Sequence, residues 1–431
     1  MVIVESQKEW DDFLDKFKST SSLIVPVQCD DNKHPLTTNL CLLYVVELED
    51  TFEYILPFNH TDTINLDVDL LGELETDESV FTYDKKKLAH FLKLKNVKDL
   101  QMLKYLKKNE PLVIEDTLTN AHEHFHRINW GRENLNCVIP ILKHLQACRK
   151  VVDIVKKCVM YNTDEPYDTY NNIVLDNLQR IESNGLQTTD GMVYSEYNPY
   201  TATGRPSNRF GGLNFAALNK KDGSRKKFIS RFGGKGMLVE MDYDAYHLRL
   251  IGDVIGYKFP NGSVHEHMAK FYGVGYEESK GLSFQYLYGH IPEEVLKINP
   301  FFEKVQKYID KVWHTFKKDK FILSDIYNKK IFMENLSDMN KNKLFNYLIQ
   351  LTETENNMRV LSKLIPDIDN FKSRLVLYNY DSFLFDFHID DGVDFLKRVK
   401  NTIEDDGKFP VKIAKGWNYH EMEDITEKFS D

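Results

Sequence analysis

An apolar strand that ends in an aspartate occurs twice, as Leu238-Val239-Glu240-Met241-Asp242-Tyr243 and as Leu375-Val376-Leu377-Tyr378-Asn379-Tyr380-Asp381. Alternating apolar side chains predict a strand for the first stretch, with Asp242 at its end. The second predicts a hairpin, because turn residues follow its apolar part and the apolar segment 383–387 then provides a second, antiparallel strand. Two such aspartates, if they meet, would bind paired Mg²⁺ ions as phosphoryl transfer requires. Singly, each is more often a turn residue or a helix N-cap.

The composition is that of a folded globular protein. The 431 residues suffice for two or three domains, 42% of them are hydrophobic, and no apolar run approaches the length of a membrane span. Five scattered cysteines form no CxxC pair, which disfavours a disulfide framework or a zinc site. The start lacks the pattern of a secretory signal. We therefore expect a cytosolic (cytoplasmic) protein of a bacterium or a phage-infected host, with an organelle as the alternative.

The charge is unevenly distributed along the chain. A net charge of −10 disfavours a nucleic-acid partner. Just before the first aspartate, however, a basic run comprises Lys220, Lys221, Arg225, Lys226, Lys227 and Arg231. The run is either a solvated surface or a contact for a phosphate backbone.

The pattern of the chain changes along its length. Residues 1 to about 125 are typical of an α/β unit, with predicted strands and helices at 23–27, 39–48, 51–56, 85–94 and 97–106. Helical periodicity follows at 136–159 and 170–183, and Asn184-Gly185 ends the second of these helices. We place a domain boundary near 150–165, where the pattern changes.

A predicted helix at 277–289 lies between the two aspartates, with acids in its first turn and Gly289 at its end. Lys280, Phe284 and Tyr288 recur every four residues and share one face. Such a face could hold a nucleoside triphosphate, with the lysine on the phosphates and Phe284 beside sugar and base. An amphipathic helix with aromatic core residues has the same spacing and is the commoner cause of it.

Four segments together resemble the family A DNA polymerases, the bacterial polymerase I type. The segment 201–207 (TATGRPS) is similar to the family's TATGRLS, 242–249 (DYDAYHLR) to its DYSQIELR motif A, 280–289 to its KxxxFxxxYG motif B, and 380–382 (YDS) stands where motif C has HDE. Weaker similarities are His265 with Ala269, Asn346 with Gln350, and Gly416-Trp417. The matches cover 201–420 in the family's order, and four ordered motifs are a specific signal.

The resemblance implies an α+β fold, a polymerase right hand of palm and fingers with a reduced thumb, preceded by an α/β RNase H-like domain of exonuclease type. It implies a degenerate 3′–5′ exonuclease-like domain at 1–150, reduced thumb or linker helices at 151–200, and the palm and fingers at 201–431.

The resemblance also implies roles for single residues. Asp242 and Asp381 would be catalytic and, with the backbone carbonyl of Tyr243, would hold two Mg²⁺ ions. The residues that would bind the nucleotide are Lys280, His265, Phe284, Tyr288 and His247. Those that would contact DNA are Arg205, Asn346, Gln350, Lys226 and Lys227.

The polymerase-like part departs from the family pattern at three positions. Tyr276 stands where motif B has an arginine, so we expect weaker nucleotide binding unless Lys270 or Arg249 substitutes. His247 replaces the motif A glutamate that resembles a gate against ribose; paired with Tyr288 it could still exclude ribose, and imidazole chemistry could make this pH-dependent. Ser382 replaces the motif C glutamate, which leaves two acids for the metals.

The N-terminal part departs from the family as well. The stretch 23–29 (LIVPVQC), where the exonuclease DxE pair would stand, holds no acid, and Asp84 and Asp99 alone do not restore a site. Only about 50 residues separate this part from Thr201, where the family has a long helical thumb. We therefore expect no proofreading and low processivity unless a partner clamps the DNA.

We predict a template-directed DNA polymerase, a nucleotidyltransferase that extends a primer 3′-hydroxyl with dNTPs. Its partners would be primer–template DNA, dNTPs and a processivity or replisome protein, with no membrane. Two alternatives stay open. One is a catalytically impaired polymerase-like protein that binds primer–template. The other is a relative of single-subunit RNA polymerases, which is favoured by His247 at the position of the motif A glutamate.

Overall fold

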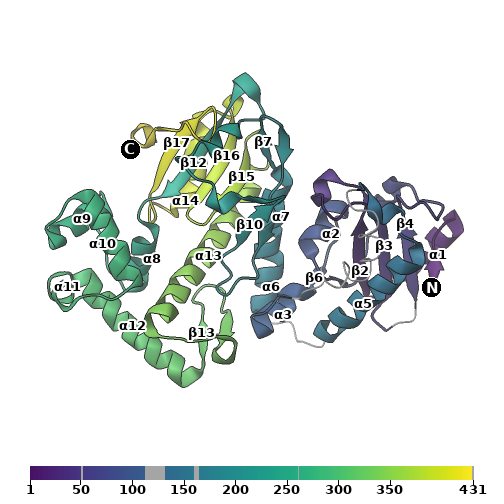
Figure 1. The fold of residues 1–431 in the computed structure, drawn as a ribbon, viewed down its shortest axis with the longest axis horizontal. Helices are drawn as coiled ribbons and strands as arrows, with labels where there is room; N and C mark the ends of the chain where they lie inside the picture. Colours follow the sequence, from purple (N-terminus) through teal and green to yellow (C-terminus); the bar gives the residue numbers. More distant parts are fainter. Residues whose placement is uncertain (50–51, 112–131, 160–164, 261, 430–431) are drawn as a thin grey trace. The chain divides into compact units, whose positions relative to one another are not determined.

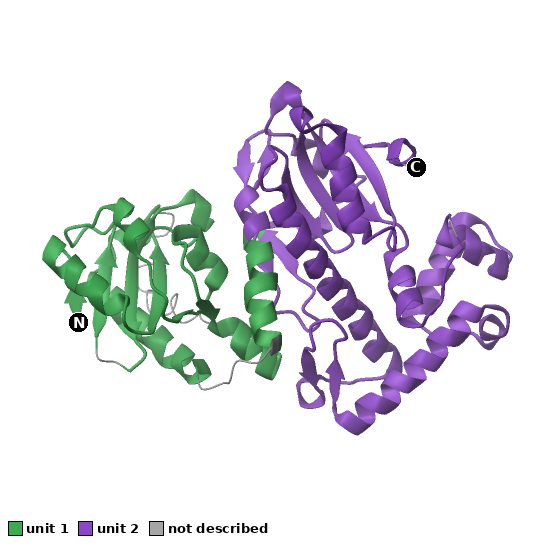
Figure 2. Cartoon of the chain, turned by 180° about the vertical axis from the view of Figure 1, so that it is seen from behind, with its two compact units in different colours: residues 1–179, 210–212 green, residues 180–209, 213–431 purple. Residues whose placement is uncertain are grey.

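The structure, a computed structural model, describes residues 1–49, 52–111, 132–159, 165–260 and 262–429. The chain forms two compact units, residues 1–179 with 210–212 and residues 180–209 with 213–431 (Figure 2). Each unit combines helices with a sheet, so the predicted α+β class is confirmed (Figure 1). No described helix is both long and apolar enough to cross a membrane.

The first unit is built on a six-stranded mixed sheet in the order β1-β4-β3-β2-β5-β6. The strands are β1 (Val2–Ile3), β2 (Ser22–Gln28), β3 (Leu40–Glu47), β4 (Glu53–Pro57), β5 (Val80–Thr82) and β6 (Val97–Asp99). Strand β2 pairs antiparallel with β3 and parallel with β5. The helices are α1 (Gln7–Phe17), α2 (Lys85–Phe91), α3 (Leu100–Lys108), α5 (Ile141–Val159) and α6 (Glu165–Thr169). Aromatic side chains of α1 pack into the core with strand residues such as Ile24 and Leu43.

Two predicted helix starts in this unit are wrong. Residues 97–99 form strand β6, because Val97 pairs with Val80 of β5, a partner that local periodicity does not reveal. Helix α5 starts at Ile141 rather than near 136, because Pro140 lacks an N–H and disfavours helix before it. The strand predicted at 51–56 is found as β4, although its first residue lies outside the described residues, as do residues 160–164 of the predicted boundary.

Asp84 and Asp99 each cap a helix in this unit. The Asp84 side chain accepts the N–H of Lys87 at 3.0 Å, and that of Asp99 accepts the N–H of Met102 at 2.7 Å. Asp99 is fully buried, which raises its pKa to about 7. Both acids therefore stabilise the first turns of α2 and α3.

The second unit contains a five-stranded antiparallel sheet in the order β15-β16-β12-β17-β18. Its strands are β12 (Gly236–Tyr243), β15 (Arg374–Asn379), β16 (Ser382–His388), β17 (Val411–Gly416) and β18 (Glu423–Asp424). The strand and the hairpin predicted from the two opening stretches are therefore confirmed. Val239 and Met241 of the central strand are fully buried, as expected for the face that packs into the core.

Helices complete the second unit. They are α8 (Tyr246–Val254), α9 (Val264–Tyr272), α10 (Tyr276–Tyr288), α11 (Glu293–Ile298), α12 (Pro300–Asp319), α13 (Lys341–Ile368) and α14 (Gly392–Glu404), while α7 (Leu175–Asn184) leads into the unit. The short strands are β7 (Leu186–Thr188), β8 (Gly191–Val193), β9 (Tyr197–Asn198), β10 (Ser207–Phe210), β11 (Leu213–Asn214), β13 (Phe321–Leu323) and β14 (Lys330–Phe332). The long helix α13 contacts α8, α10, α12 and α14 (Figure 1).

Two predicted helix ends are confirmed. Helix α10 ends before Gly289, where a Cβ would lie 2.7 Å from the carbonyl oxygen of Gln285. Helix α7 ends before Gly185, whose φ of +58° is the left-handed conformation that favours glycine. The segment 170–174 before α7 is a π-helical turn rather than regular α-helix.

Candidate active site

The two aspartates meet at one end of the five-stranded sheet. Asp242 is the cross-strand partner of Ser382 in β16, and Asp381 directly precedes Ser382 in the hairpin turn. The N–H of Tyr243 donates to the carbonyl oxygen of Asp381 at 3.0 Å, which holds the turn against the end of β12. Strand pairing therefore brings together the two side chains that the sequence predicts as metal ligands.

Both carboxyl groups are weaker acids than ordinary aspartates. Burial, followed by the charges of Asp381 and Glu240, raises the pKa of Asp242 to about 7. Protein atoms exclude part of the water around the Asp381 carboxyl, and this effect, followed by the charge of Glu353, raises the pKa of Asp381 even though the residue is exposed. The exposed ammonium of Lys220 lies 3.7 Å from Asp242 Oδ2, and such an exposed pair contributes little. Crowded negative charge of this kind favours the binding of a divalent cation.

The raised pKa of Asp242 predicts how Mg²⁺ changes stability. A carboxyl whose pKa is higher in the folded than in the unfolded state makes the metal-free protein less stable as pH rises through about 4 to 7, since the folded state holds the extra proton. Mg²⁺ competes with that proton. Scanning calorimetry should therefore show a larger Mg²⁺-induced rise in Tm at pH 8 than at pH 5.5, and Asp242→Asn should remove the difference. Equal shifts at both pH values in both proteins would contradict this site.

The predicted nucleotide-binding face of α10 is not its core face. Core contacts come from Ser279, Ser283 and Leu287, whereas Lys280 is exposed and the rings of Phe284 and Tyr288 are half-buried. These two rings lie parallel, with centroids 6.1 Å apart and an interplanar angle of 5°. A flat surface with a cation at one end is what a nucleotide needs, whereas Tyr288 also packs against the hydrophobic core, as the alternative of a structural aromatic stripe predicts.

His265 of α9 lies beside this face. Its ring centroid is 5.9 Å from that of Phe284, and its carbonyl oxygen accepts the hydroxyl of Ser279 at 2.8 Å, which joins α9 to α10. Burial lowers the pKa of His265, so the ring is neutral. Its Nδ1 is buried and makes no hydrogen bond with any described residue.

His247 and Tyr288 form the pair that the sequence suggests. Nδ1 of His247, on α8, is hydrogen-bonded to the Tyr288 hydroxyl, and the two rings meet edge to face with centroids 5.8 Å apart. The pair therefore joins α8, which begins within the segment 242–249, to the end of α10.

A cavity of about 770 Å³ opens beside Asp244, and its described lining includes none of the residues predicted to hold the metals or the nucleotide. Arg249, Tyr276 and Lys412 line it, and Asp244 lies between the cations, with its oxygens 3.2 Å from Arg249 Nη2 and 3.0 Å from Lys412 Nζ. Lys412 is the cross-strand partner of Asp242, so both side chains lie on the same face of the sheet. Of the two substitutes considered for the missing arginine, Arg249 lines this cavity, whereas Lys270 does not belong to its described lining.

The predicted DNA-contacting residues of motif TATGR and of α13 adjoin each other. The Thr203 hydroxyl donates to Gln350 Oε1 at 3.0 Å, and Asn346 lies one turn earlier on the same helix. The guanidinium of Arg205 stacks on the ring of Tyr380, the residue before Asp381, with Cζ 3.7 Å from the ring centroid. Arg205 thus lies next to the aspartate turn.

The basic run 220–231 divides into two groups. Arg225 is buried and donates to the carbonyl oxygen of Leu218, and Arg231 forms an ion pair of 2.8 Å with the buried Asp386. These two arginines stabilise the fold. The side chain of Lys226 is 59% exposed, and the Lys227 ammonium lies 5.4 Å from the Phe228 ring centroid. Only part of the run is therefore exposed at the surface.

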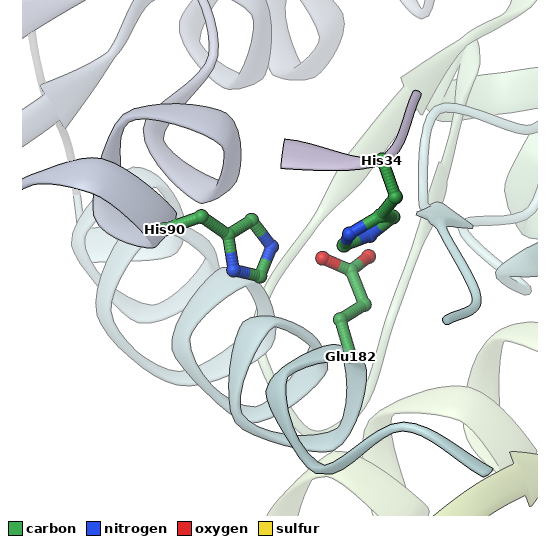
Figure 3. A group of neighbouring side chains, drawn as sticks. All are labelled: His34, His90 and Glu182. Atoms are coloured by element: carbon green, nitrogen blue, oxygen red, sulfur yellow. The ribbon is translucent and has the colours of Figure 1, made fainter. Parts of the chain in front are cut away.

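Figure 3 labels two histidines of the first unit, His34 and His90, whose ring centroids are 5.2 Å apart. The third labelled residue, Glu182, belongs to the second unit, where its carboxylate accepts the N–H of Tyr197 at 2.7 Å. Two histidines from one unit are an incomplete ligand set for a metal ion, so the predicted aspartates remain the stronger candidates.

The sequence-based prediction missed three polar residues of the site, namely Glu353, Glu240 and Lys412. Glu353 follows Gln350 by three residues, a helical spacing that puts both on one face and could have identified it. Glu240 precedes Asp242 by two residues and so shares its face of the strand. Lys412 has no such local signal, because its place beside Asp242 depends on pairing between β12 and β17.

No family model matches the sequence, and no curated protein matches it either. Among solved structures, the chain is similar to the POL domain of Pol1 from M. smegmatis in complex with DNA primer-template and dNTP. The TM-score is 0.71 and the sequence identity 13%, and the match covers 98% of this chain and 100% of that chain. At this identity the similarity concerns the fold: the chain has the α+β fold of a DNA polymerase domain.

Proposed function

We propose that this chain is a template-directed DNA polymerase that extends a primer 3′-hydroxyl with dNTPs. The observation that carries the proposal is the meeting of Asp242 with the Asp381 turn, with Tyr288 of α10 near enough to Asp381 to be affected by its charge. The similarity in fold to a polymerase domain supports it independently of these residues.

In the proposed reaction, the primer 3′-oxygen attacks the α-phosphorus of the dNTP. A phosphodiester bond forms, the bond between the α-phosphorus and the bridging oxygen breaks, pyrophosphate leaves and the hydroxyl proton passes to solvent. Asp242, Asp381 and the Tyr243 carbonyl are suited by donor type and charge to two Mg²⁺ ions, which when bound would activate the hydroxyl and neutralise the leaving pyrophosphate.

Other residues of the site would bind and orient the substrates. Lys280 would hold the phosphates, and the unpaired Nδ1 of neutral His265 is placed to contribute a further hydrogen bond. Phe284 and Tyr288 would pack against the nascent base pair. The residues that would contact primer and template are Arg205, Asn346, Gln350, Lys226 and Lys227.

We assign residues 1–150 to a non-editing scaffold, 151–200 to a reduced thumb and 201–431 to palm and fingers. The helix-capping bonds of Asp84 and Asp99 support the absence of proofreading, since both acids stabilise helix ends.

Primer extension with Mg²⁺ and either dNTPs or rNTPs tests the proposed function. A DNA polymerase should extend with dNTPs and leave a mismatched 3′-terminus intact. Extension with rNTPs alone would support the RNA polymerase alternative, and primer–template binding without any extension would support the binding-protein alternative.

Lys412 is expected to take over part of the task of the missing motif B arginine. Lys412 lies on the Asp242 face of the sheet, its ammonium shares Asp244 with Arg249, and it lines the same cavity as Tyr276. Lys412→Met should raise the dNTP KM by about tenfold with a smaller change in kcat, because a charge-assisted contact to phosphate is lost. Single-nucleotide insertion kinetics measure this.

Lys415→Met is the matched control, since residue 415 lies on the opposite face of the same strand. Its KM should stay within about twofold of the unsubstituted protein. A Lys412 variant with an unchanged KM would show that the triphosphate does not reach this cavity.

A further inference from the structure

Glu353 is a carboxylate enclosed within the polymerase-like unit. It lies on α13, three residues after Gln350, and is fully buried. An ionised carboxylate out of water destabilises the fold unless cations and hydrogen bonds compensate. The groups around it therefore explain why such a residue is tolerated.

Two cationic or potentially cationic side chains from distant segments approach Glu353. Arg205 donates from Nη2 to Oε1 at 3.2 Å, and its Nε lies 2.9 Å from Oε2. Nε2 of His247 lies 3.2 Å from Oε1. The Nε and Nε2 contacts are electrostatic, since their angles depart from those of hydrogen bonds. One carboxylate thus joins the TATGR loop to α8.

The contact of Glu353 with His247 determines what the imidazole can offer to Tyr288. In the neutral ring, a carboxylate facing Nε2 favours the proton on that nitrogen, which leaves Nδ1 as an acceptor. The Tyr288 hydroxyl must then donate to Nδ1, the atom to which it is bonded. Burial first, and then the charge of Glu353, raises the pKa of Tyr288 well above its usual value, so the hydroxyl keeps the proton that it donates.

We propose that Glu353 is a specificity-determining positioning residue, which holds His247, and through it Tyr288, at the sugar edge of the nucleotide site and so excludes ribonucleotides. The inference rests on the proposed polymerase function and goes beyond the predicted pair of His247 with Tyr288. A ring that is hydrogen-bonded at Nδ1 and held at Nε2 by the nearby carboxylate is restrained from rotating, which would keep the space beside the 2′-carbon closed to a hydroxyl group.

The same carboxylate would link this exclusion to the primer. Arg205, the second partner of Glu353, stacks on Tyr380 next to Asp381. A primer terminus that displaced Arg205 would therefore disturb the anchor of His247, whereas a correctly seated terminus would leave it intact.

The test compares Glu353→Gln with Glu355→Gln in the full chain. Glu355 is a matched control, because it is a buried glutamate on the same helix whose Oε2 accepts the N–H of Tyr327 at 3.0 Å. Single insertions of a dNTP and of the corresponding rNTP give the ratio of their kcat/KM values. We expect this ratio to fall by about tenfold or more in Glu353→Gln, mainly through a lower rNTP KM, and to stay within about twofold in Glu355→Gln.

A second set of variants keeps the inference falsifiable if Glu353→Gln does not fold. Glu353→Asp retains the charge but withdraws it from His247, and it should lower the ratio in the same direction. Adding Glu353→Asp or Glu353→Gln to His247→Ala should cause no further fall, since both act through the same ring.

Each outcome decides between the claims. Equal losses for dNTP and rNTP, with a lowered Tm and an unchanged ratio, would assign Glu353 to stability alone and overturn the inference. A ratio near one in the unsubstituted protein would also overturn it while leaving the polymerase function intact. No dNTP insertion by the unsubstituted protein would overturn the proposed function and the inference together.

Discussion

Asparagine at Asp242, or at Asp381, should slow nucleotide insertion by about 10³-fold or more, since the amide keeps the shape of the side chain but loses the charge that binds the ions. Primer–template affinity should change by less than about threefold, because the residues proposed to contact DNA are side chains other than these two aspartates. The double variant should be hardly slower than either single one, as residues that act as a unit are non-additive. Rapid-quench insertion kinetics and fluorescence anisotropy measure the two quantities.

Asp190→Asn serves as the control for this pair. Asp190 is exposed in the turn between β7 and β8, within the same unit. Its insertion rate should stay within about twofold of the unsubstituted rate. Thermal stability separates catalysis from folding: removing one of two repelling carboxylates should leave Tm unchanged or raise it. Near-normal insertion by either aspartate variant would remove that residue from the chemistry.

Alanine at Lys280 should lower kcat/KM for dNTPs by about 10²-fold. The reason is that, in the proposed reaction, the exposed ammonium at the start of the ring-bearing face of α10 would stabilise charge on the leaving pyrophosphate. Part of the loss should appear in kcat, which distinguishes a contact that strengthens in the transition state from simple binding.

Lys297→Ala provides the comparison for Lys280, because Lys297 is an exposed lysine on the neighbouring helix α11. It should leave kcat/KM within about twofold. If the Lys280 variant behaves like this control, the face of α10 does not bind the triphosphate, and the cavity lined by Arg249 and Lys412 becomes the stronger candidate.

Local sequence patterns predicted the elements that form the aspartate pair. The strand before Asp242 and the hairpin around Asp381 follow from apolar alternation and turn residues, and both are found as β12 and as β15 with β16. The end of α10 at Gly289 was also predictable from local sequence. A side chain at this position would collide with the carbonyl oxygen of Gln285, only four residues earlier.

Contacts between distant segments could not be predicted in this way. Residues 97–99 were predicted to be helical, because the local periodicity of the sequence does not reveal that they pair with β5. Arg225 and Arg231 looked like surface cations, yet they bond to Leu218 and Asp386 inside the fold. The charge balance of the site likewise depends on Glu353, which only the tertiary structure brings next to His247.

The most direct test of the account is single-nucleotide insertion with each of the four dNTPs opposite each template base, in Mg²⁺, by the purified chain and by Asp242→Asn. The account predicts that the complementary dNTP is inserted in every case and that the variant loses this insertion. Insertion that ignores the template base, insertion that persists in the variant, or none at all by the unsubstituted chain would contradict it.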